Sequence, residues 1–437
     1  MTPAAPAPVP AAARAGALPL SVVVVSRGRP ADLRLCLTAL AQSDHPALEI
    51  VVVACPAGVA AVGAAGLAAR LKLQPFNVPN ISAARNRGLA RAAGEVVAFI
   101  DDDALAEPTW AGRLAAVFAD PRIGAACGFT RGRNGISHQW RAETVDASGA
   151  DAPLPVDPDR PSVHAGTAAR AVKPVGTNCA FRRAALAAAG GFDPSFRFYL
   201  EDADIGLRLA AAGWLTAVVP RAEVQHGFAA SAQRRADRVP RSLHEIGASL
   251  AVFLRRHAPE ADPAPVLARM RAAQRRRLVG HMRDGRLGPE AVGAILATFD
   301  AGLAEGAARP LGPLTAVPAP DAPFMTFGGT GPAPGCMILS TPRTRAAAEA
   351  AARAARAEGR IVTLLSLAPG WRRHRMRLRP DGIWEQAGGL WGRSDRARPP
   401  LAPWSPAARP DARVAAEARR IAPVRPVEPA ESRPPRP

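Results

Sequence analysis

Between residues 18 and 130, short runs of consecutive apolar residues alternate with stretches whose apolar residues recur at helical spacing. The runs predict buried strands, and the stretches between them predict helices. The predicted strands are 21–25, 49–53, 71–76 and 95–100, and the predicted helices are 31–43, 56–70 and 81–93. Strands that alternate with helices imply a parallel sheet whose ligand lies at the carboxyl ends of the strands.

Beyond this region the pattern changes several times. Gly, Asp and Pro are frequent in residues 131–170, which predicts a long, partly irregular connection, and a helix is predicted over 201–212. Apolar stripes over 242–257 and 289–303 predict two helices packed on the α/β unit. The predicted organisation begins with a disordered leader at 1–18, an α/β domain at 19–230 and a helical extension at 231–305. A Pro/Gly linker follows at 306–335, and residues 336–392 could form a small α/β module with a hairpin. The last segment, 393–437, is predicted to be a disordered basic Pro/Arg-rich tail.

Cysteine usage and the absence of long apolar runs suggest a cytoplasmic protein. The five cysteines show no C-x-x-C spacing, which favours neither a zinc site nor a disulfide framework. No stretch approaches the roughly 18 to 20 consecutive apolar residues of a membrane-spanning helix. The N-terminus has no basic residue before Arg14 and is interrupted by proline, so we expect a flexible leader and not a signal peptide.

The positive charge is unevenly distributed. The net charge is +19, of which residues 1–230 contribute +3 (22 basic against 19 acidic residues) and residues 231–437 contribute +16 (34 against 18). Such a balance could attract nucleic acid, an anionic membrane surface or an acidic polymer. Because most of the basic residues are arginine and both alanine and proline are abundant, the codon bias of a GC-rich genome explains the same composition.

Three consecutive carboxylates, Asp101, Asp102 and Asp103, follow the apolar run 96–100 directly. Like charges held close together at a sheet edge need a cation or a proton between them. Mg²⁺ and Mn²⁺ prefer carboxylate oxygen and bridge carboxylates to substrate phosphates in nucleotide sites. The alternative is an acidic turn that caps the next helix, because Asp is favoured both in turns and near helix N-termini.

Four segments in order resemble the signatures of glycosyltransferase family 2. They are SVVVVSRGRP, NVPNISAARNRGLARAAGEVVAFIDDDALAEPTW, GTNCAFRRAALAAAGGFDPSFRFYLEDADIGLRLAAAGW and VVPRAEVQH, and together they cover about residues 19–228. The resemblance implies a GT-A fold for residues 19–230, a nucleotide-diphosphate-sugar donor, a divalent metal and inversion at the anomeric carbon. The fold class is then α/β, with a mixed, mostly parallel sheet flanked by helices.

The resemblance also assigns the acidic residues. Asp101 and Asp103 match the family's D-x-D, which implies that Asp101 contacts the nucleotide ribose or the metal and that Asp103 binds Mn²⁺ or Mg²⁺ directly. A metal would stabilise the negative charge that grows on the departing diphosphate. Asp102 is also predicted as a contact of the donor, although alternation along an extended segment would point it elsewhere. His226 ends an apolar run and resembles the histidine that completes the metal shell; otherwise it is a surface histidine.

Glu201 and Asp202 resemble the E-D pair of the family, in which the second carboxylate is the general base. A carboxylate within hydrogen-bond reach of an acceptor hydroxyl aids its attack by removing its proton. We therefore predict Asp202 as the base and Glu201 as its neighbour on the acceptor side. Both acids could also cap the predicted helix 201–212, where the helix dipole favours negative charge.

Donor contacts are predicted at Ser26, Arg27 and Arg29, which follow the first strand, and at Arg85, which matches a family residue that reaches the base or the phosphates. A planar guanidinium can bind two phosphate oxygens, although any one of these arginines could be a solvated surface charge. Ala54 stands where the family commonly has an Asp that contacts the nucleobase, so the usual uridine preference is in doubt. The Q-x-x-R-W motif of processive synthases is absent after His226, which favours a single-addition transferase.

Taken together, the sequence predicts a metal-dependent glycosyltransferase of cell-envelope or secreted glycan synthesis. Its partners would be a nucleotide-diphosphate sugar and a glycan, lipid-linked or small-molecule acceptor, with no specific nucleic acid. We expect a cytoplasmic protein with peripheral contact to the anionic inner face of the membrane, because the C-terminal half is basic. The alternatives are a basic binding protein with a relic transferase domain, and a nucleotidyltransferase, which the absence of a Gly-rich phosphate loop disfavours.

Overall fold

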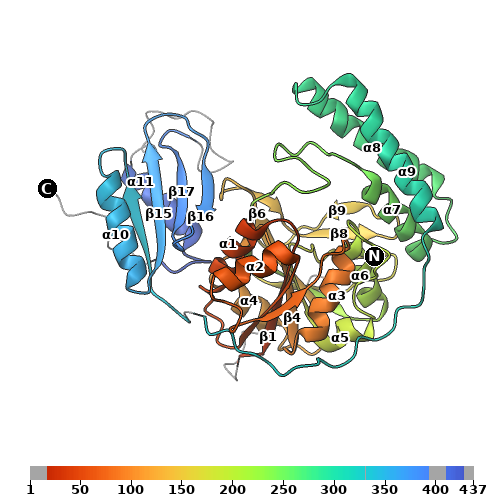
Figure 1. Ribbon diagram of the computed structural model, residues 1–437, viewed down its shortest axis with the longest axis horizontal. Coiled ribbons are helices and arrows are strands. Elements are labelled where there is room, and N and C mark those ends of the chain that lie inside the picture. The colour runs from red at the N-terminus through yellow and green to blue at the C-terminus, as the bar shows by residue number, and fades with distance from the viewer. Residues whose placement is uncertain (1–16, 330, 393–409, 428–437) are drawn as a thin grey trace.

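The computed structural model describes residues 17–329, 331–392 and 410–427 (Figure 1). A large mixed sheet with helices on both faces forms the body. A group of helices extends from one side of the body, and a smaller α/β unit lies at the opposite side. The predicted leader at 1–18 lies almost entirely outside the described residues.

The large sheet has the strand order β10-β13-β6-β12-β4-β1-β2-β3. Strands β4, β1, β2 and β3 are parallel, whereas β12 runs antiparallel to both β4 and β6, which makes the sheet mixed. Its members are β1 (Leu20–Ser26), β2 (Leu48–Ala54), β3 (Lys72–Pro75), β4 (Val96–Asp101), β6 (Ile123–Arg131), β10 (Ser162–His164), β12 (Asn178–Arg182) and β13 (Leu215–His226), with β5 (Ala104–Ala106) on β13 and β7 (His138–Trp140) on β6.

Helices cover both faces of this sheet. One apolar cluster joins the sheet to α1 (Pro30–Leu40), α2 (Pro56–Ala64) and α4 (Trp110–Val117). A second cluster on the other face joins it to α3 (Ile81–Arg91), α5 (Arg183–Ala188) and α6 (Glu201–Ala211). Because both faces are buried, the central strands are nearly continuous apolar runs, and this confirms the predicted strands and helices to within a few residues at most ends. Helix α2 is the exception, ending at Ala64 although the prediction extended to residue 70.

Residues 131–170, predicted to be partly irregular, contain several short strands. Strand β8 (Glu143–Asp146) pairs with β9 (Asp151–Pro153) and with β11 (Arg170–Val172) in a separate sheet. Val145 and Ala171 of this sheet join a third apolar cluster with residues of α6 and α7. The connection is therefore anchored to the body on the side of α6.

The helical extension contains α7 (His244–His257), α8 (Ala264–Arg283) and α9 (Pro289–Ala308). Helices α7 and α9 approach closely at glycines, since a Cβ on Gly302 or Gly306 would meet backbone oxygens of α7. Helix α8 was not predicted, because only its Leu278 is buried and its sequence shows no wide apolar stripe. Helix α9 is the one described helix long and apolar enough to span a membrane, by length and composition alone, and 22% of its most apolar window is buried.

Residues 309–334 cross the body without a helix or strand among those described, running along the lower edge in Figure 1. The Phe327 amide donates to the Leu48 carbonyl at 2.7 Å, and the Met325 amide donates to Glu49 Oε1 at 2.8 Å. These partners belong to the amino-terminal end of β2. The connection therefore passes at the end of the sheet opposite the Asp triplet.

The smaller unit is a four-stranded sheet with the order β14-β15-β17-β16. The predicted hairpin is the antiparallel pair β16 and β17. Its elements are β14 (Gly335–Ser340), α10 (Arg345–Ala357), β15 (Ile361–Ala368), β16 (Arg375–Leu378) and β17 (Trp384–Gly389).

The prediction of a wholly disordered tail at 393–437 is wrong for residues 410–427. Helix α11 (Pro410–Ile421) packs against the smaller unit, and Ile421 joins an apolar cluster with β14 and β15. Val414, Ala418 and Ile421 recur at helical spacing and pack in this cluster. Arg413 and Glu417 are also buried, and they lie 3.4 Å apart as an ion pair. Residues 393–409 and 428–437 lie outside the described residues.

A buried ion pair joins the end of this segment to the body. Arg425 donates to both carboxylate oxygens of Glu107 at 2.9 and 3.0 Å, and the two side chains are at most 1% exposed. The guanidinium also donates to Thr363 and lies 4.0 Å above the Trp384 ring. The Arg425 side chain thus contacts the body through Glu107 and the smaller unit through Thr363 and Trp384.

We predict that Arg425→Leu lowers the free energy of unfolding by about 3–5 kcal/mol, because it leaves Glu107 buried without a counter-charge. Urea unfolding followed by tryptophan fluorescence measures the loss. The double variant Glu107→Gln, Arg425→Leu should recover about 1–3 kcal/mol of it. If Arg425→Leu is as stable as the wild type, the pair does not join the two units.

Candidate active site

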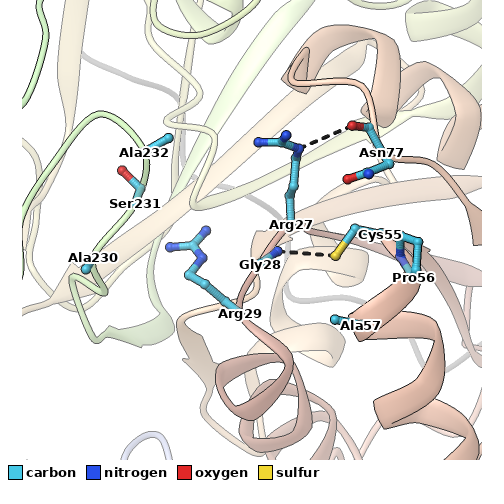
Figure 2. A pocket seen from close by; sticks show the side chains of 10 residues that line it. All are labelled: Arg27, Gly28, Arg29, Cys55, Pro56, Ala57, Asn77, Ala230, Ser231 and Ala232. Carbon is cyan, nitrogen blue, oxygen red and sulfur yellow. Dashed lines mark hydrogen bonds between the residues drawn. The ribbon is translucent and has the colours of Figure 1, made fainter.

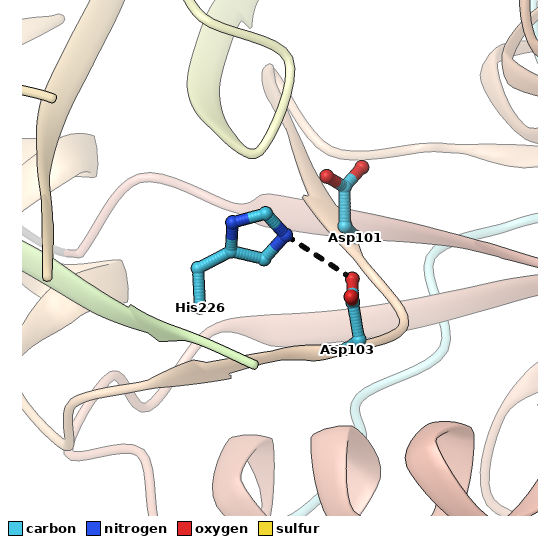
Figure 3. A group of neighbouring side chains, drawn as sticks. All are labelled: Asp101, Asp103 and His226. Carbon is cyan, nitrogen blue, oxygen red and sulfur yellow. Dashed lines mark ion pairs between the residues drawn. The ribbon is translucent and has the colours of Figure 1, made fainter. Parts of the chain in front are cut away.

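Three side chains with metal-binding atoms meet at the carboxyl edge of the large sheet. Asp101 is the last residue of β4, and the chain then turns through Asp103 into β5. Strand β5 pairs with the end of β13 so that Ala104 lies opposite His226. This register places His226 Nε2 3.4 Å from Asp103 Oδ1, and one ligand atom from each of Asp101, Asp103 and His226 lies within 4.8 Å of the others (Figure 3).

Asp103 is held in its charged form. Burial alone would raise its pKa, but the hydrogen bond and charge of His226 and the charge of Arg29 keep the pKa below its usual range. The backbone amide of Ala229 also donates to Asp103 Oδ2 at 2.7 Å. On His226, Nδ1 lies 3.0 Å from Gln139 Oε1 and can donate its proton there. A protonated Nε2 donates to Asp103, whereas a cation that replaces this proton would be bound by the Nε2 lone pair. A carboxylate and an imidazole lone pair are thus available to one cation.

Asp101 is more open than Asp103. Its side chain is 29% exposed, and one of its oxygens accepts a hydrogen bond from Thr177 Oγ1 at 2.6 Å. The other oxygen lies 3.7 Å from the Arg85 guanidinium. Asp101 therefore faces the opening of the site while Thr177 fixes its orientation.

Asp102 points away from this group, in the direction that alternation along the segment predicts. It is fully buried and pairs with Arg29 at 2.5 Å. Burial raises the pKa of Asp102 to about 7, although the charge of Arg29 lowers it. Arg29 also lies 3.3 Å from Asp103. The side chain of Asp102, predicted among the donor contacts, thus lies beneath the site and supports Arg29.

A cavity of about 550 Å³ opens next to this group (Figure 2). One wall is formed by the ends of β1 and β2, and the opposite wall by the segment that follows β13. Its lining residues are Arg27, Gly28, Arg29, Cys55, Pro56, Ala57, Asn77, Ala230, Ser231 and Ala232. Of the predicted donor contacts, Arg27 and Arg29 line this cavity, whereas Ser26 is 2% exposed and lies outside the lining.

Asn77 also lines the cavity and was not among the predicted donor contacts. It follows β3, and its side chain borders the cavity while its carbonyl accepts from Arg27 Nε at 3.3 Å. Ala54, in contrast, is fully buried against α2. The signal for Asn77 was its place directly after the third predicted strand, at the same edge as the other polar residues.

Arg85 connects the metal-binding group to the Glu201–Asp202 pair. Its buried guanidinium donates to Glu201 Oε1 at 2.9 Å and to the Gly176 carbonyl at 3.2 Å, and it does not line the cavity. The Gly176 amide in turn donates to Asp202 Oδ2 at 3.0 Å. A Cβ on Gly176 would lie 2.5 Å from the Arg85 guanidinium, so any side chain at this position would displace the guanidinium from its present place.

The backbone before α6 is strained. Tyr199 and Leu200 have φ values of +75° and +67°, a region that residues with side chains rarely adopt. The strained turn starts α6 so that its first two residues, Glu201 and Asp202, face the Gly176 loop. Burial raises the pKa of Glu201 even though the Arg85 charge lowers it.

We predict that Thr177→Val weakens Mn²⁺ binding by about 10- to 100-fold, because it removes the hydrogen bond that orients Asp101. Isothermal titration with Mn²⁺ measures the effect. Thr177→Ser keeps the hydroxyl and is the matched control, expected to bind as the wild type does. Wild-type Mn²⁺ affinity in a folded Thr177→Val protein would contradict this role.

Comparisons with known proteins give several matches. The family model described as "Glycosyltransferase like family 2" matches residues 18–242, just over half of the chain. The N-acetylglucosaminyl-diphospho-decaprenol L-rhamnosyltransferase of Mycobacterium tuberculosis is 51% identical over 53 residues, which are 12% of this chain and 17% of the relative. The O-antigen biosynthesis protein RfbC of Myxococcus xanthus is 27% identical over 259 residues, which are 56% of this chain and 20% of the relative. The chain thus spans about a fifth of the length of these relatives.

Two solved structures are also similar. GalNAc-T7 with UDP, GalNAc and Mn²⁺ matches at 16% identity and a TM-score of 0.41, over 55% of this chain and 48% of that one. The mannosyltransferase PcManGT of Pyrobaculum calidifontis with GDP-Man and Mn²⁺ matches at 20% identity and a TM-score of 0.39, over 68% and 89%. The four sequence segments and the sheet that carries them lie within the part matched by the family model, and the chain belongs to glycosyltransferase family 2.

Proposed function

We propose that the protein transfers a sugar from a nucleotide-diphosphate donor to an acceptor hydroxyl, with a divalent metal held by Asp101, Asp103 and His226. The observation that carries the proposal is the convergence of these three side chains beside the 550 Å³ cavity. Two carboxylates and one imidazole form a donor set suited to Mn²⁺ or Mg²⁺. When bound, the metal would neutralise the charge that develops on the leaving diphosphate.

The cavity is the proposed nucleotide site. Arg27 and Arg29 on its wall supply planar guanidiniums for phosphate oxygens, and the pairing of Arg29 with Asp102 holds that side chain in place. Asn77 offers an amide that can both donate to and accept from a nucleobase. This amide is the proposed substitute for the aspartate whose place Ala54 takes, and it suits bases other than uracil as well.

Asp202 is the proposed general base. Its two oxygens accept backbone hydrogen bonds, from Gly176 at 3.0 Å and from Ala203 at 2.8 Å, which fix the carboxylate while leaving lone pairs free. Glu201 is paired with Arg85, so its role is to shape the acceptor side. One carboxylate base acting on the acceptor hydroxyl suits a single displacement with inversion.

The relatives suggest the biological setting. Their names describe a rhamnosyltransferase that acts on a diphospho-decaprenol glycan and an O-antigen biosynthesis protein. We therefore infer a role in cell-envelope glycan synthesis, with a glycan, lipid-linked or small-molecule acceptor. The nucleotide base and the donor sugar follow from the ligand panel described below.

Helix α8 supports peripheral contact of a cytoplasmic enzyme with an anionic membrane. All six of its arginines are exposed, at positions 269, 271, 275, 276, 277 and 283. Arg271 pairs with Asp300, whereas Arg275 and Arg276 have no ion-pair partner among the described residues. Anionic lipid headgroups attract such a row of positive charges.

The test of the main proposal is a thermal-shift and hydrolysis panel of sugar nucleotides with Mn²⁺, since a specific ligand raises stability by mass action. We expect one donor class to raise the melting temperature and to release nucleoside diphosphate. Asp202→Asn should keep this shift and lose about 10²- to 10⁴-fold in turnover. Asp103→Asn should lose the part of the shift that depends on Mn²⁺.

Each variant is first compared with the wild type without ligand, so that a folding defect is recognised. A wild-type protein that neither binds nor hydrolyses any sugar nucleotide in the panel would refute the proposal. Release of a sugar 1-phosphate in place of nucleoside diphosphate would indicate nucleotidyl transfer.

The membrane proposal is tested by sedimentation with phosphatidylserine vesicles. Arg275→Glu combined with Arg276→Glu should weaken partitioning by about 2 kcal/mol, roughly 30-fold, because each basic residue contributes about 1 kcal/mol. Neutral phosphatidylcholine vesicles are the control. Equal binding to both kinds of vesicle, or to neither, would exclude an electrostatic contact through α8.

A further inference from the structure

Three guanidiniums surround one aromatic ring beside the metal-binding group. Phe228 is buried, and its ring centroid lies 4.5 Å from that of His226. Arg133, Arg234 and Arg238 lie over the Phe228 ring at 5.5, 5.7 and 4.3 Å. These three residues are called the arginine cluster below.

The cluster is assembled from two separate segments. Arg133 lies in the turn between β6 and β7, whereas Arg234 and Arg238 lie in the segment that follows β13. Phe228 has a φ of +54°, an unfavourable conformation for a phenylalanine, so the chain is strained where the ring is placed under the guanidiniums. Backbone strain of this kind is typical of functional sites, so the cluster is a candidate for a binding role.

No described carboxylate forms an ion pair with any member of the cluster. Arg133 donates to carbonyl oxygens, including that of Gly227 at 2.7 Å, and Arg234 donates to the Ala229 carbonyl at 3.1 Å. Arg234 Nε is buried without a hydrogen-bond partner. Arg238 contacts the ring and has no ion-pair or side-chain hydrogen-bond partner among the residues that the structure describes. The cluster thus holds three positive charges with unused donors.

The charges repel one another. Burial and the neighbouring charges of Arg238 and Arg375 lower the pKa of Arg133. Burial also lowers the pKa of Arg234, as do the charges of Arg238, Arg29 and Arg133, while Asp103 opposes the effect. A ligand with several negative charges would relieve this repulsion. Planar guanidiniums fit phosphate oxygens best, because each can bind two of them.

The cluster lies outside the donor cavity, on the side of the acceptor residues. None of its members lines the cavity, whose arginines are Arg27 and Arg29. Arg286, which follows α8, donates to the Asp237 carbonyl at 3.2 Å and so ties the segment that carries Arg234 and Arg238 to the end of this helix. Helix α8 shares an apolar cluster with Tyr199 and Leu200, which precede Asp202. The cluster is therefore placed between the metal-binding group and the elements that present the proposed base.

We propose that the arginine cluster binds a phosphate or diphosphate group carried by the acceptor. The inference rests on the proposed glycosyl transfer and narrows its acceptor to a phosphate-ester-linked glycan. Arg238 and Arg234 hold the phosphate oxygens, and Arg133 completes the site from the opposite segment. The bound phosphate then positions the acceptor hydroxyl, several atoms away, near Asp202. The phosphate contributes binding energy and orientation but takes no part in the transfer reaction.

The probe is inorganic pyrophosphate, titrated calorimetrically into the full chain in EDTA so that no metal holds it. We expect one site whose affinity falls with salt, and a loss of about 10- to 100-fold in the double variant Arg234→Gln, Arg238→Gln. Arg238→Gln alone, at an exposed residue whose side chain has no described hydrogen-bond partner, should show part of the loss without a change in melting temperature. Arg241→Gln, in the same segment but outside the cluster, is the matched control and should bind within twofold of the wild type.

A second arm distinguishes the acceptor from the donor as the source of the phosphate. The titration is repeated on protein saturated with Mn²⁺ and the nucleoside diphosphate that the ligand panel identifies. We expect pyrophosphate still to bind, and the affinity for the nucleotide to be unchanged in the double variant. Loss of pyrophosphate binding under these conditions, together with weaker nucleotide binding by the variant, would assign the cluster to the donor diphosphate and overturn the inference.

The outcome of the pyrophosphate titration does not depend on whether the protein transfers sugar. Asp202→Asn should bind pyrophosphate as the wild type does, since Asp202 is outside the cluster. A protein that hydrolyses a sugar nucleotide but binds no pyrophosphate would refute the acceptor phosphate site alone. Equal pyrophosphate binding by the wild type and the double variant would refute it as well.

Discussion

The site depends on two guanidiniums that hold carboxylates of like charge together. Arg29 lies between Asp102 and Asp103, and Arg85 lies between Asp101 and Glu201. Without these pairs the negative charges at the ends of β4 and α6 would repel one another in a partly buried space. The two arginines leave the outward oxygens of Asp101 and Asp103 available, and this balance makes the edge of the sheet suitable for a cation.

Elements far apart in the sequence support this arrangement. The turn between β6 and β7 leads into Gln139, which contacts His226, and it carries Arg133 of the arginine cluster. The smaller unit holds the same turn, since the Met376 amide donates to the Arg133 carbonyl at 2.9 Å and Gln386 donates to the Asn134 carbonyl at 3.0 Å. A chain segment more than two hundred residues away thus contributes to the orientation of the proposed metal ligand.

The sequence was most informative where one physical rule dominates. Continuous apolar runs predicted the central strands, and their carboxyl ends located Asp101 and Asp103 at the edge where His226 also lies. Asp102 was expected to point elsewhere from simple alternation, and it does. These inferences needed only local periodicity and the geometry of a parallel sheet.

Features that depend on long-range pairing of polar groups could not be predicted in this way. Helix α11 buries Arg413 and Glu417 as well as Ile421, and the charged residues on its packed side obscure a short apolar stripe in a Pro/Arg-rich sequence. Arg85 matched a donor contact by resemblance, yet its guanidinium pairs with Glu201, a partner 116 positions away. The arginine cluster likewise arises from two segments about a hundred residues apart, so no local pattern marks it.

The most direct measurement is an anomalous difference map from crystals soaked with Mn²⁺ and a nucleoside diphosphate. Metal-dependent glycosyl transfer predicts one manganese peak within bonding distance of Asp101, Asp103 and His226, with the nucleotide in the cavity that Arg27 and Asn77 line. A map without a peak at these three side chains while the nucleotide is bound, or a peak at another group, would contradict it.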